Sequence, residues 1–557
     1  MNENINKNPL RAHYPSLWKI CLIYSICYLL FAYQNADGIG SGIFSLISVA
    51  VILLIASILK KDETLPRTPH ITPMSVFYLI MAAFISFSNC MTDNFFFIFF
   101  NHIGSFLLFS IGCIKLFYDD KHWDFSKYTG TLMIYWCQVL AAIPMPFEDF
   151  ASTREEKKED PKKENTTTKY IIIGILCGLP ILFITTALLA SADMIFSDFL
   201  DNIFSFTGLN NIITEFSNHF MEYLILLPVC FFIYFILMYL VMGALSKGGI
   251  KEEGKEPMQF QAAIAITIFV MIDMVYVLFS TIQFVYLFGG LPSSAHSYAE
   301  YAREGFFQLL FVAFINFLLV LFCNRHFHKN VVLKIAMTIT CICTFVMIAS
   351  SAYRMQLYIH EYHLTFLRVL VLWFLLVLTF LMIGCILSIH IEKWNSFRYS
   401  LFIFTLLYTV FSLSNIDKQI ATYNVSKFEE ALIQSQGKEK VYLDTYLPDG
   451  YYASKSYAKV LSDLYTKYDK QLSDCNKHII NSYFIENYHD EFGDFASMFY
   501  YYDDSDFVLD PNAYIYDSDY QASVLCWKHL NFIEAQSYNL YKTYYNTHYD
   551  EYRRYLY

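Results

Sequence analysis

Residues 39–59 read IGSGIFSLISVAVILLIASIL, a stretch of 21 residues without a charged side chain. A helix of about 20 apolar residues spans the roughly 30 Å of hydrocarbon in a bilayer, so this stretch predicts a transmembrane helix. The rest of the chain has a similar character: 56% of its 557 residues are hydrophobic and 16% are charged. Soluble proteins carry about 25% charged residues. We therefore expect an all-α integral membrane protein.

Ten further stretches are long, apolar and free of Lys and Arg over their middles. They are residues 17–33, 71–90, 94–117, 170–190, 221–245, 260–287, 305–323, 331–352, 366–389 and 398–416. The sequence thus predicts eleven transmembrane helices. Segment 127–147 is apolar but short and ends in Pro144-Met145-Pro146, so we expect it to be interfacial or re-entrant.

The charged and polar stretches divide the chain into four parts. Residues 1–126 form a four-span block, and residues 127–169 contain the interfacial segment and a charged cytoplasmic linker. Residues 170–416 form a seven-span core block. Residues 417–557 form an acidic, Tyr-rich helical domain.

Basic residues predict the orientation, because cytoplasmic loops of membrane proteins are enriched in Lys and Arg. They gather in alternate loops, at Lys60, Lys61 and Arg67 and in a cluster within 148–169. Loop 191–220 contains acidic residues and no Lys or Arg. We therefore expect a multi-pass protein of the cytoplasmic membrane with a cytoplasmic N-terminus and an extracytoplasmic domain at 417–557.

The C-terminal domain carries 13 Lys/Arg and 22 Asp/Glu. This acidic balance argues against nucleic acid or anionic lipid as its partner.

Ser426 and Glu429 have the spacing of a capping box and predict a helix that begins there and ends near Gly437. A second helix is predicted from the spacing of Tyr457, Val460, Leu461, Leu464, Tyr465, Tyr468 and Leu472, and a third over 518–545.

Charged residues within or beside the spans are the candidate functional or structural positions. Asp273 lies in the middle of a predicted span, where a carboxylate is costly and is often functional. The others lie at predicted outer boundaries and form a candidate charge network with it: Asp193, Glu300, Arg303, Glu304, Arg354, Glu361 and Arg368. Arg354, Glu361 and Arg368 are seven residues apart and would share one stripe of a continuous helix. For Arg303, and for Arg354 or Arg368, we expect an acidic partner from a different segment. Local ion pairs that fix the span ends would also explain these residues.

Motifs for catalysis are absent from the sequence. It contains no phosphate-binding glycine loop, no nucleophile elbow and no Cys/His spacing of a zinc site. We therefore expect no enzyme activity, no cofactor and no metal. The Asp-rich stretch 503–519 lacks the Gly and closing Glu of an EF-hand, which leaves calcium binding as the weaker alternative there.

Several long stretches resemble a bacterial membrane-protein family known as domain of unknown function 4173, with its relative 4153. The closest is Gln283-Phe-Val-Tyr-Leu-Phe-Gly-Gly290 followed by Ser297-Tyr-Ala-Glu-Tyr-Ala-Arg-Glu-Gly-Phe-Phe307. Three others follow the family order: Leu189 to Asp193, Tyr353 to Arg368, and Asp417 to Asn424. The resemblance covers about residues 70 to 450, and it implies the membrane class without implying an activity.

Two functions fit these observations. The first is an envelope sensor or assembly scaffold, in which 417–557 binds an envelope component or another membrane protein. The alternative is a proton- or ion-coupled transporter that uses the intramembrane Asp273. In both cases the bilayer surrounds the helices.

The predicted orientation can be tested with reporters. A reporter that is active only outside the cytoplasm, fused after Tyr423, should be active, and the same reporter inserted within 152–168 should be silent. A cytoplasmic reporter should give the opposite pattern. If both sites report the same side, the predicted topology is wrong.

Overall fold

The computed structural model describes residues 10–141, parts of 226–245, residues 259–289 and 306–492, and a few positions between 533 and 541, with short gaps inside these ranges. Within them the elements are helices, and the only β-type pairing is an isolated bridge between Phe260 and Phe327. Nine of the described helices are long and apolar enough to cross a membrane. The protein is therefore a polytopic α-helical membrane protein.

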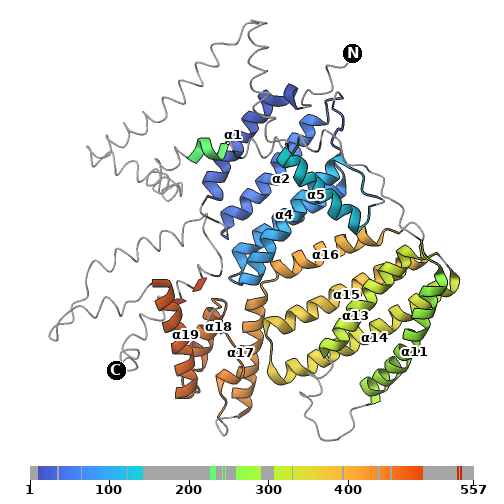
Figure 1. Ribbon diagram of the computed structural model, residues 1–557. Coiled ribbons are helices and arrows are strands. Elements are labelled where there is room, and N and C mark those ends of the chain that lie inside the picture. The colour runs from blue at the N-terminus through green and yellow to red at the C-terminus, as the bar shows by residue number, and fades with distance from the viewer. Residues whose placement is uncertain are drawn as a thin grey trace, which may run out of the picture. The chain divides into compact units, whose positions relative to one another are not determined.

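The helices follow the predicted spans closely (Figure 1). In chain order they are α1 (Tyr14–Phe31), α2 (Ile39–Leu59), α3 (Pro73–Ser88), α4 (Phe95–Phe117), α5 (Phe125–Ala141), α11 (Ala262–Gly289), α13 (Phe306–His326), α14 (Val331–Tyr362), α15 (Phe366–His390), α16 (Ser396–Leu413), α17 (Ile416–Ser435), α18 (Tyr457–Tyr468) and α19 (Asp474–Phe492). Short 3-10 helices lie at Arg11–His13, Asn89–Met91 and Leu443–Thr445. The predicted span 170–190 lies outside the described residues, and 221–245 is described only in part. Segment 127–147 corresponds to the 17-residue helix α5, and its interfacial placement stays a prediction.

The chain divides into two compact units, which are described separately. The first comprises residues 1–34, 50–71 and 133–249, and in it the ring of His13 lies 2.8 Å from the carboxylate of Asp62. The second comprises residues 35–49, 72–132 and 250–557. It contains α3, α4 and every described helix from α11 onward.

Polar side chains begin several of its helices. Asn94, Asn330 and Asn395 each precede a helix and accept a hydrogen bond from a backbone N–H of its first turn. Thr72 and Ser75 form a capping box at the start of α3. These caps satisfy backbone donors that no carbonyl within the helix can reach.

Asn101 of α4 joins three helices within the second unit. Its side chain donates to Ser88 and Asn89 at the end of α3, over 3.0 and 2.7 Å. It accepts from Tyr408 and Ser412 of α16, over 2.9 and 3.0 Å. Asn101 is fully buried, so these contacts replace the water that the bilayer does not supply.

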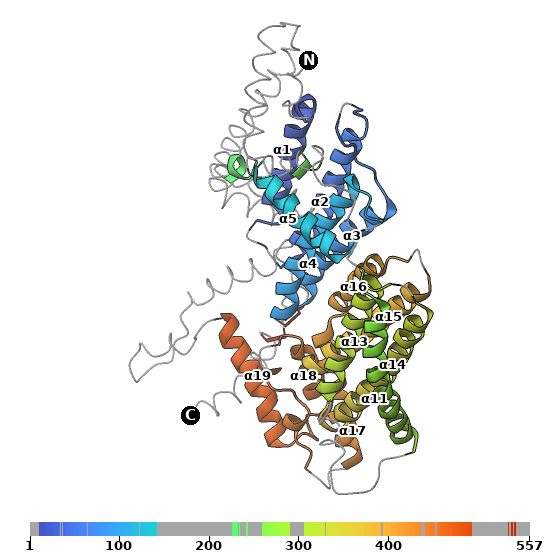
Figure 2. The same ribbon diagram turned by 45° about the vertical axis from the view of Figure 1, so that its right-hand side comes forward.

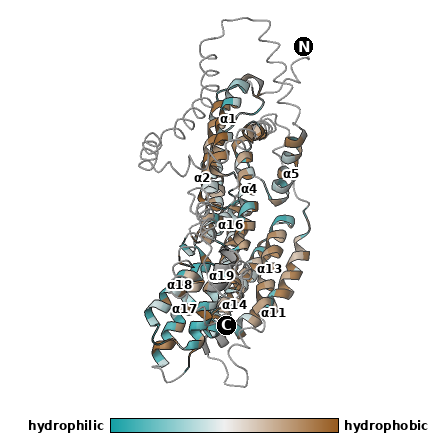
Figure 3. Ribbon diagram, turned by 90° about the vertical axis from the view of Figure 1, so that its left-hand side faces the viewer, coloured by the Kyte–Doolittle hydropathy of each residue, from teal (hydrophilic) through white to brown (hydrophobic). Residues whose placement is uncertain are grey.

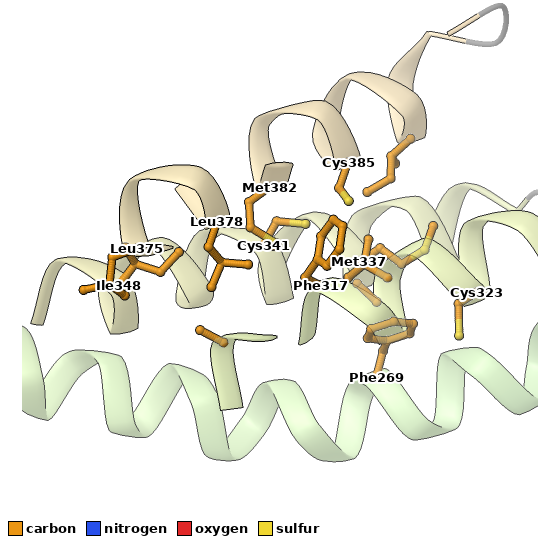
Figure 4. Packing of buried hydrophobic residues seen from close by; sticks show 14 of the residues in the cluster. Phe269, Phe317, Cys323, Met337, Cys341, Ile348, Leu375, Leu378, Met382 and Cys385 are labelled. Atoms are coloured by element: carbon orange, nitrogen blue, oxygen red, sulfur yellow. The ribbon is translucent and has the colours of Figure 1, made fainter. Parts of the chain in front are cut away.

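Helices α11, α13, α14 and α15 lie side by side and share one apolar core (Figures 1 and 2). Phe269, Phe317, Met337, Cys341 and Met382 turn into the same space (Figure 4). The opposite face of α11 is exposed and apolar, as expected for lipid contact, with Met271, Met274, Val275 and Leu278 at its surface. Figure 3 shows α11 and α13 as mostly hydrophobic, whereas α17 and α18 carry many hydrophilic residues.

The C-terminal helices have their own core. Buried side chains of α17, α18 and α19 form it together with Leu443 and Tyr541, and they include Phe428, Leu461, Ile480 and Tyr483. The predicted second helix is confirmed by α18, whose Tyr457, Leu461, Leu464, Tyr465 and Tyr468 are buried. Most of the predicted third helix over 518–545 lies outside the described residues. Helix α19 was not predicted, because its mixed polar sequence has no clear apolar stripe.

The predicted capping box at Ser426 is wrong. Helix α17 begins ten residues earlier, at Ile416, and Ser426 lies inside it with its hydroxyl bonded to the Tyr423 carbonyl. Asn415, with a φ of 47°, makes the turn from α16 and accepts from the Lys418 N–H. The buried residues Ile416, Ile420 and Val425 hold the extra turns against the core, so packing overrides the local cap signal.

Gly42 provides a test of this packing. A Cβ at this position would lie 2.9 Å from the Cα of Phe87, and therefore α2 and α3 can approach closely only with glycine there. We expect Gly42→Ala to lower the stability of the protein by roughly 1–3 kcal/mol. The measurement is thermal unfolding in detergent.

Gly130→Ala in α5 is the matched control, because a Cβ there meets nothing within 4 Å. It should be neutral or slightly stabilising, since alanine favours helix more than glycine does. Equal effects of the two substitutions would show that α2 and α3 do not depend on a close approach at Gly42.

Candidate functional site

Asp273 of α11 faces the interior of the bundle. Its side chain is 7% exposed, and its Oδ1 accepts a hydrogen bond from the Thr340 hydroxyl of α14 over 2.5 Å. Its Oδ2 is buried and has no hydrogen-bond partner among the residues that the structure describes. The predicted intramembrane acid thus contacts protein rather than lipid, as such residues generally do.

Asp273 is one end of a row of polar side chains between α11, α13 and α14, which we call the polar seam. Its members are Asp273, Tyr276, Gln283, Asn316, Thr340, Thr344 and Ser350. Tyr276 donates to the Asn316 side chain over 2.8 Å, and Asn316 donates to Thr344 over 3.0 Å. The Ser350 hydroxyl donates to Gln283 over 2.7 Å.

The register of the two helices produces the seam. Asp273 to Gln283 and Thr340 to Ser350 are both steps of ten residues, so α11 and α14 run parallel and their polar positions meet twice. Ten residues of helix correspond to about 15 Å. The sequence singled out Gln283 within a family motif, and the structure brings it against Ser350. The sequence did not single out Asn316 or Thr340, which look like ordinary polar residues in a span.

Arg354 lies one turn beyond Ser350 and is buried, with 8% of its side chain exposed. It lies inside α14, because this helix continues ten residues past the predicted end at 352. Glu361, near the end of the same helix, is exposed. The polar seam therefore leads toward a buried arginine at one end of the bundle.

Arg354, Glu361 and Arg368 do not share one stripe, because the stretch that carries them is not one continuous helix. Helix α14 ends at Tyr362, and His363, with a φ of 60°, turns the chain into α15. Arg368 therefore lies on the next helix. Its guanidinium donates to the carbonyls of Tyr362 and His363 and lies 4.5 Å from the ring centre of Tyr358.

The Arg368 guanidinium thus caps the C-terminus of α14 by binding its carbonyl oxygens. A cation in this position is stabilised by the helix dipole. Among the described residues Arg368 forms no ion pair with an acid, and the acidic partner expected for Arg354 or Arg368 stays a prediction. The other members of the predicted charge network, Asp193, Glu300, Arg303 and Glu304, lie outside the described residues. The cross-segment partner of Arg303 therefore stays a prediction.

The turn between α14 and α15 is attached to the C-terminal helices. Asn424 of α17 accepts from the Leu364 N–H over 2.9 Å and donates to the Leu364 carbonyl over 2.8 Å. The His363 ring stacks on Tyr446 at 4.4 Å between centroids. We call this contact region the junction, and it unites two motifs that are 60 residues apart in the sequence.

Two carboxylates lie at the same junction. Asp417 of α17 accepts from the Asn94 side chain over 3.1 Å, and Asp93 accepts from the Lys455 N–H over 2.6 Å. Burial raises the pKa of Asp417 to about 6, and the nearby negative charge of Asp93 adds to the effect. The neutral form of Asp417 is therefore favoured in the folded protein.

An ionic cluster lies at the opposite end of the bundle and was not predicted. Asp120 accepts from Lys115 and Tyr128, and the Arg398 Nε lies 3.7 Å from it. Arg325 at the end of α13 pairs with Asp124. This cluster fastens the loop after α4 to α13 and α16. The sequence feature that could have indicated this cluster is Lys115 in the last turn of a span, with Asp120 five residues later.

Nothing in the described part of the chain points to a metal centre: no three His, Cys, Asp or Glu side chains come together there. The candidate site is therefore the polar seam inside the helical bundle, together with the C-terminal helices that contact one end of the bundle at the junction.

A family model described as a domain of unknown function (DUF4153) matches residues 79–453. The chain belongs to the DUF4153 family. The resemblance to this family is confirmed, and the match includes Asp273, Gln283, Arg354, Arg368 and Asn424. No curated protein and no solved structure matches the chain. In this DUF4153 protein the matched region ends within the C-terminal helices, so the family region includes the junction.

The raised pKa of Asp417 predicts a pH dependence. Its folded value of about 6 exceeds the ordinary 3.8, so ionisation opposes folding. The contribution of Asp417 to stability should be fully present below about pH 4 and should be lost as the pH rises through about 6, by up to roughly 3 kcal/mol. Asp417→Asn should remove this part of the dependence and raise the melting temperature at pH 7.

The control is Asp449→Asn, which removes an exposed carboxylate from the same region. Thermal unfolding in detergent from pH 4 to 8 measures both variants. If wild type and Asp417→Asn lose stability equally between pH 4 and 6, Asp417 does not carry the buried charge.

Proposed function

We propose that this DUF4153 protein is an envelope sensor or assembly scaffold whose C-terminal domain, residues 417–557, binds an envelope component outside the cytoplasmic membrane. The reciprocal pair of hydrogen bonds between Asn424 and Leu364 is the observation that carries the proposal. It fixes the domain to a turn between two membrane helices. A change in the domain can therefore reach the bundle directly.

The C-terminal domain is suited to bind a partner because it buries its own core. Phe428, Leu461, Ile480 and Tyr483 pack inside it and give it a hydrophobic core of its own. A shallow hollow lies on the exposed face of α17 and is lined by Lys418, Gln419, Thr422, Tyr423 and Ser426. Tyr423 contributes an aromatic ring to this hollow, and aromatic residues are enriched at protein interfaces.

The relay runs from α17 through the α14–α15 turn. Asn424 holds the backbone of Leu364, and Arg368 holds the end of α14 at the neighbouring carbonyls. Helix α14 also carries Ser350 and Thr340 of the polar seam. A shift of the turn would therefore move the helix that forms one side of the seam.

Asn424→Ala tests the relay. It leaves the Leu364 N–H and carbonyl without these partners, at a cost of about 1–3 kcal/mol. Amide hydrogen exchange of the α14–α15 turn should accelerate, and the protection of α17 should fall with it. Thr466→Ala on the exposed side of α18 is the control and should change neither region.

Binding is tested in cells with a photoreactive amino acid at Gln419, in the hollow on α17, and with the same residue at Thr466 as control. We expect a discrete adduct with an envelope component from position 419 only. Unchanged exchange at the turn in Asn424→Ala would overturn the relay, and the absence of an adduct at 419 would overturn the binding surface.

The second candidate is a proton- or ion-coupled transporter, which the burial of Asp273 favours. A bundle that carries an ionisable group in its interior can couple the charge of that group to movement of a solute. Net ion or proton flux through the reconstituted protein, abolished in Asp273→Asn, would favour this function over the sensor.

A further inference from the structure

Among the residues that the structure describes, the surroundings of Asp273 are apolar except for the polar seam. Phe269 precedes it by one turn, and Met337 and Cys341 of α14 lie in the same buried core (Figure 4). The titratable groups that face it are Tyr276 on its own helix and Cys341 and Cys343 on α14. No Lys, Arg or His in the described ranges forms an ion pair with it.

An ionised carboxylate in this position would have a single hydrogen bond, from Thr340, and no counter-charge among these residues. Burial of such a charge is far more costly than burial of a neutral acid. A neutral carboxyl group fits the observed contacts, because Oδ1 accepts from Thr340 and Oδ2 can carry the proton. The observed contacts therefore fit the protonated form of Asp273.

We propose that Asp273 is a reversible proton-binding site, which exchanges its proton along the polar seam with the end of the bundle that carries Arg354. The proposal does not depend on either function above. A proton at Asp273 would supply a pH input to a sensor, and it would supply the coupling ion of a transporter.

The ligand is a proton rather than a metal cation because the site offers few oxygen atoms. Cations such as Ca²⁺ and Mg²⁺ need about six oxygen ligands. The described residues at Asp273 provide its own two oxygens and the Thr340 hydroxyl. A proton requires one acceptor, and Oδ2 is that acceptor.

The seam supplies groups that can pass a proton or hold a bridging water. Beyond Asp273 these are the Tyr276 and Thr344 hydroxyls with Asn316, and then Gln283 with Ser350. Such side chains both donate and accept hydrogen bonds. The opposite direction along α11 leads to Phe269 and Ala265, which are apolar and buried, so exchange runs toward Gln283.

Dicyclohexylcarbodiimide tests the bound proton on the intact protein in detergent. This apolar reagent adds a neutral carboxylic acid across one C=N bond: the carboxyl oxygen bonds to the central carbon and the proton moves to nitrogen. The acyl group then transfers to nitrogen, and the whole reagent mass remains on the residue. Peptide mass spectrometry locates the adduct.

We expect an adduct on the peptide that contains Asp273, with a yield that falls as the pH rises from 5 to 9. Asp273→Asn should lose this adduct, and the exposed Glu361 should gain none. An unmodified Asp273 across this range would overturn the proton site, and so would a yield that does not change with pH. The wild-type measurement decides this even if a variant fails to fold.

Infrared spectroscopy after a pH step tests the route. The carbonyl band of the neutral acid, assigned by its loss in Asp273→Asn, should disappear several-fold more slowly in Gln283→Leu and Ser350→Ala. Thr379→Ala on α15, whose hydroxyl bonds only within its own helix, should keep the wild-type rate. Unchanged rates in both seam variants would show that the proton takes another path and would overturn the seam as its route.

Discussion

A polar group inside a bilayer has no water to bind, and this constraint organises the second unit of the protein. Asn101, Asn316 and Asp273 are each almost completely buried within helices that are otherwise apolar. Each finds its partners on neighbouring helices, so each hydrogen bond also fixes how two helices pack. The apolar side chains fill the remaining space, but apolar contact alone does not distinguish a correct register from one shifted by a turn.

The same requirement explains why hydrogen bonds and ion pairs hold the ends of the helices. At one end, Arg368 and Asn424 satisfy backbone groups of the α14–α15 turn, which would otherwise lie unpaired near the membrane boundary. At the other end, the buried Lys115 meets Asp120 together with Tyr128 and Arg398. Polar contacts therefore hold the bundle at both ends, and the polar seam crosses it between them.

The proposed sensor and the proposed proton site share helix α14. Its end contacts the C-terminal domain through the turn at His363 and Leu364, and its middle holds Thr340 against Asp273. Such an arrangement allows protonation and domain binding to influence one another through one rigid element, which is the physical requirement for coupling between two sites. Asp417, whose pKa is raised by burial and by the nearby negative charge of Asp93, is a second titratable position at the junction.

The sequence by itself determined the membrane class, the positions of the described spans, the family and the place of Asp273 inside a span. These follow from local properties: the length of apolar stretches, the rarity of charge inside them and the order of long motifs. It also predicted α18, because one apolar stripe on a helix is visible without its partner. Tertiary structure decided the start of α17, the end of α14 and the partners of every polar residue. Ser426 has the pattern of a cap, yet packing of Ile416 and Ile420 extends the helix past it. Arg354 and Arg368 share a heptad spacing, yet the turn at His363 places them on different helices. A hydrogen bond between helices depends on which faces meet, and that is fixed only when the whole bundle packs.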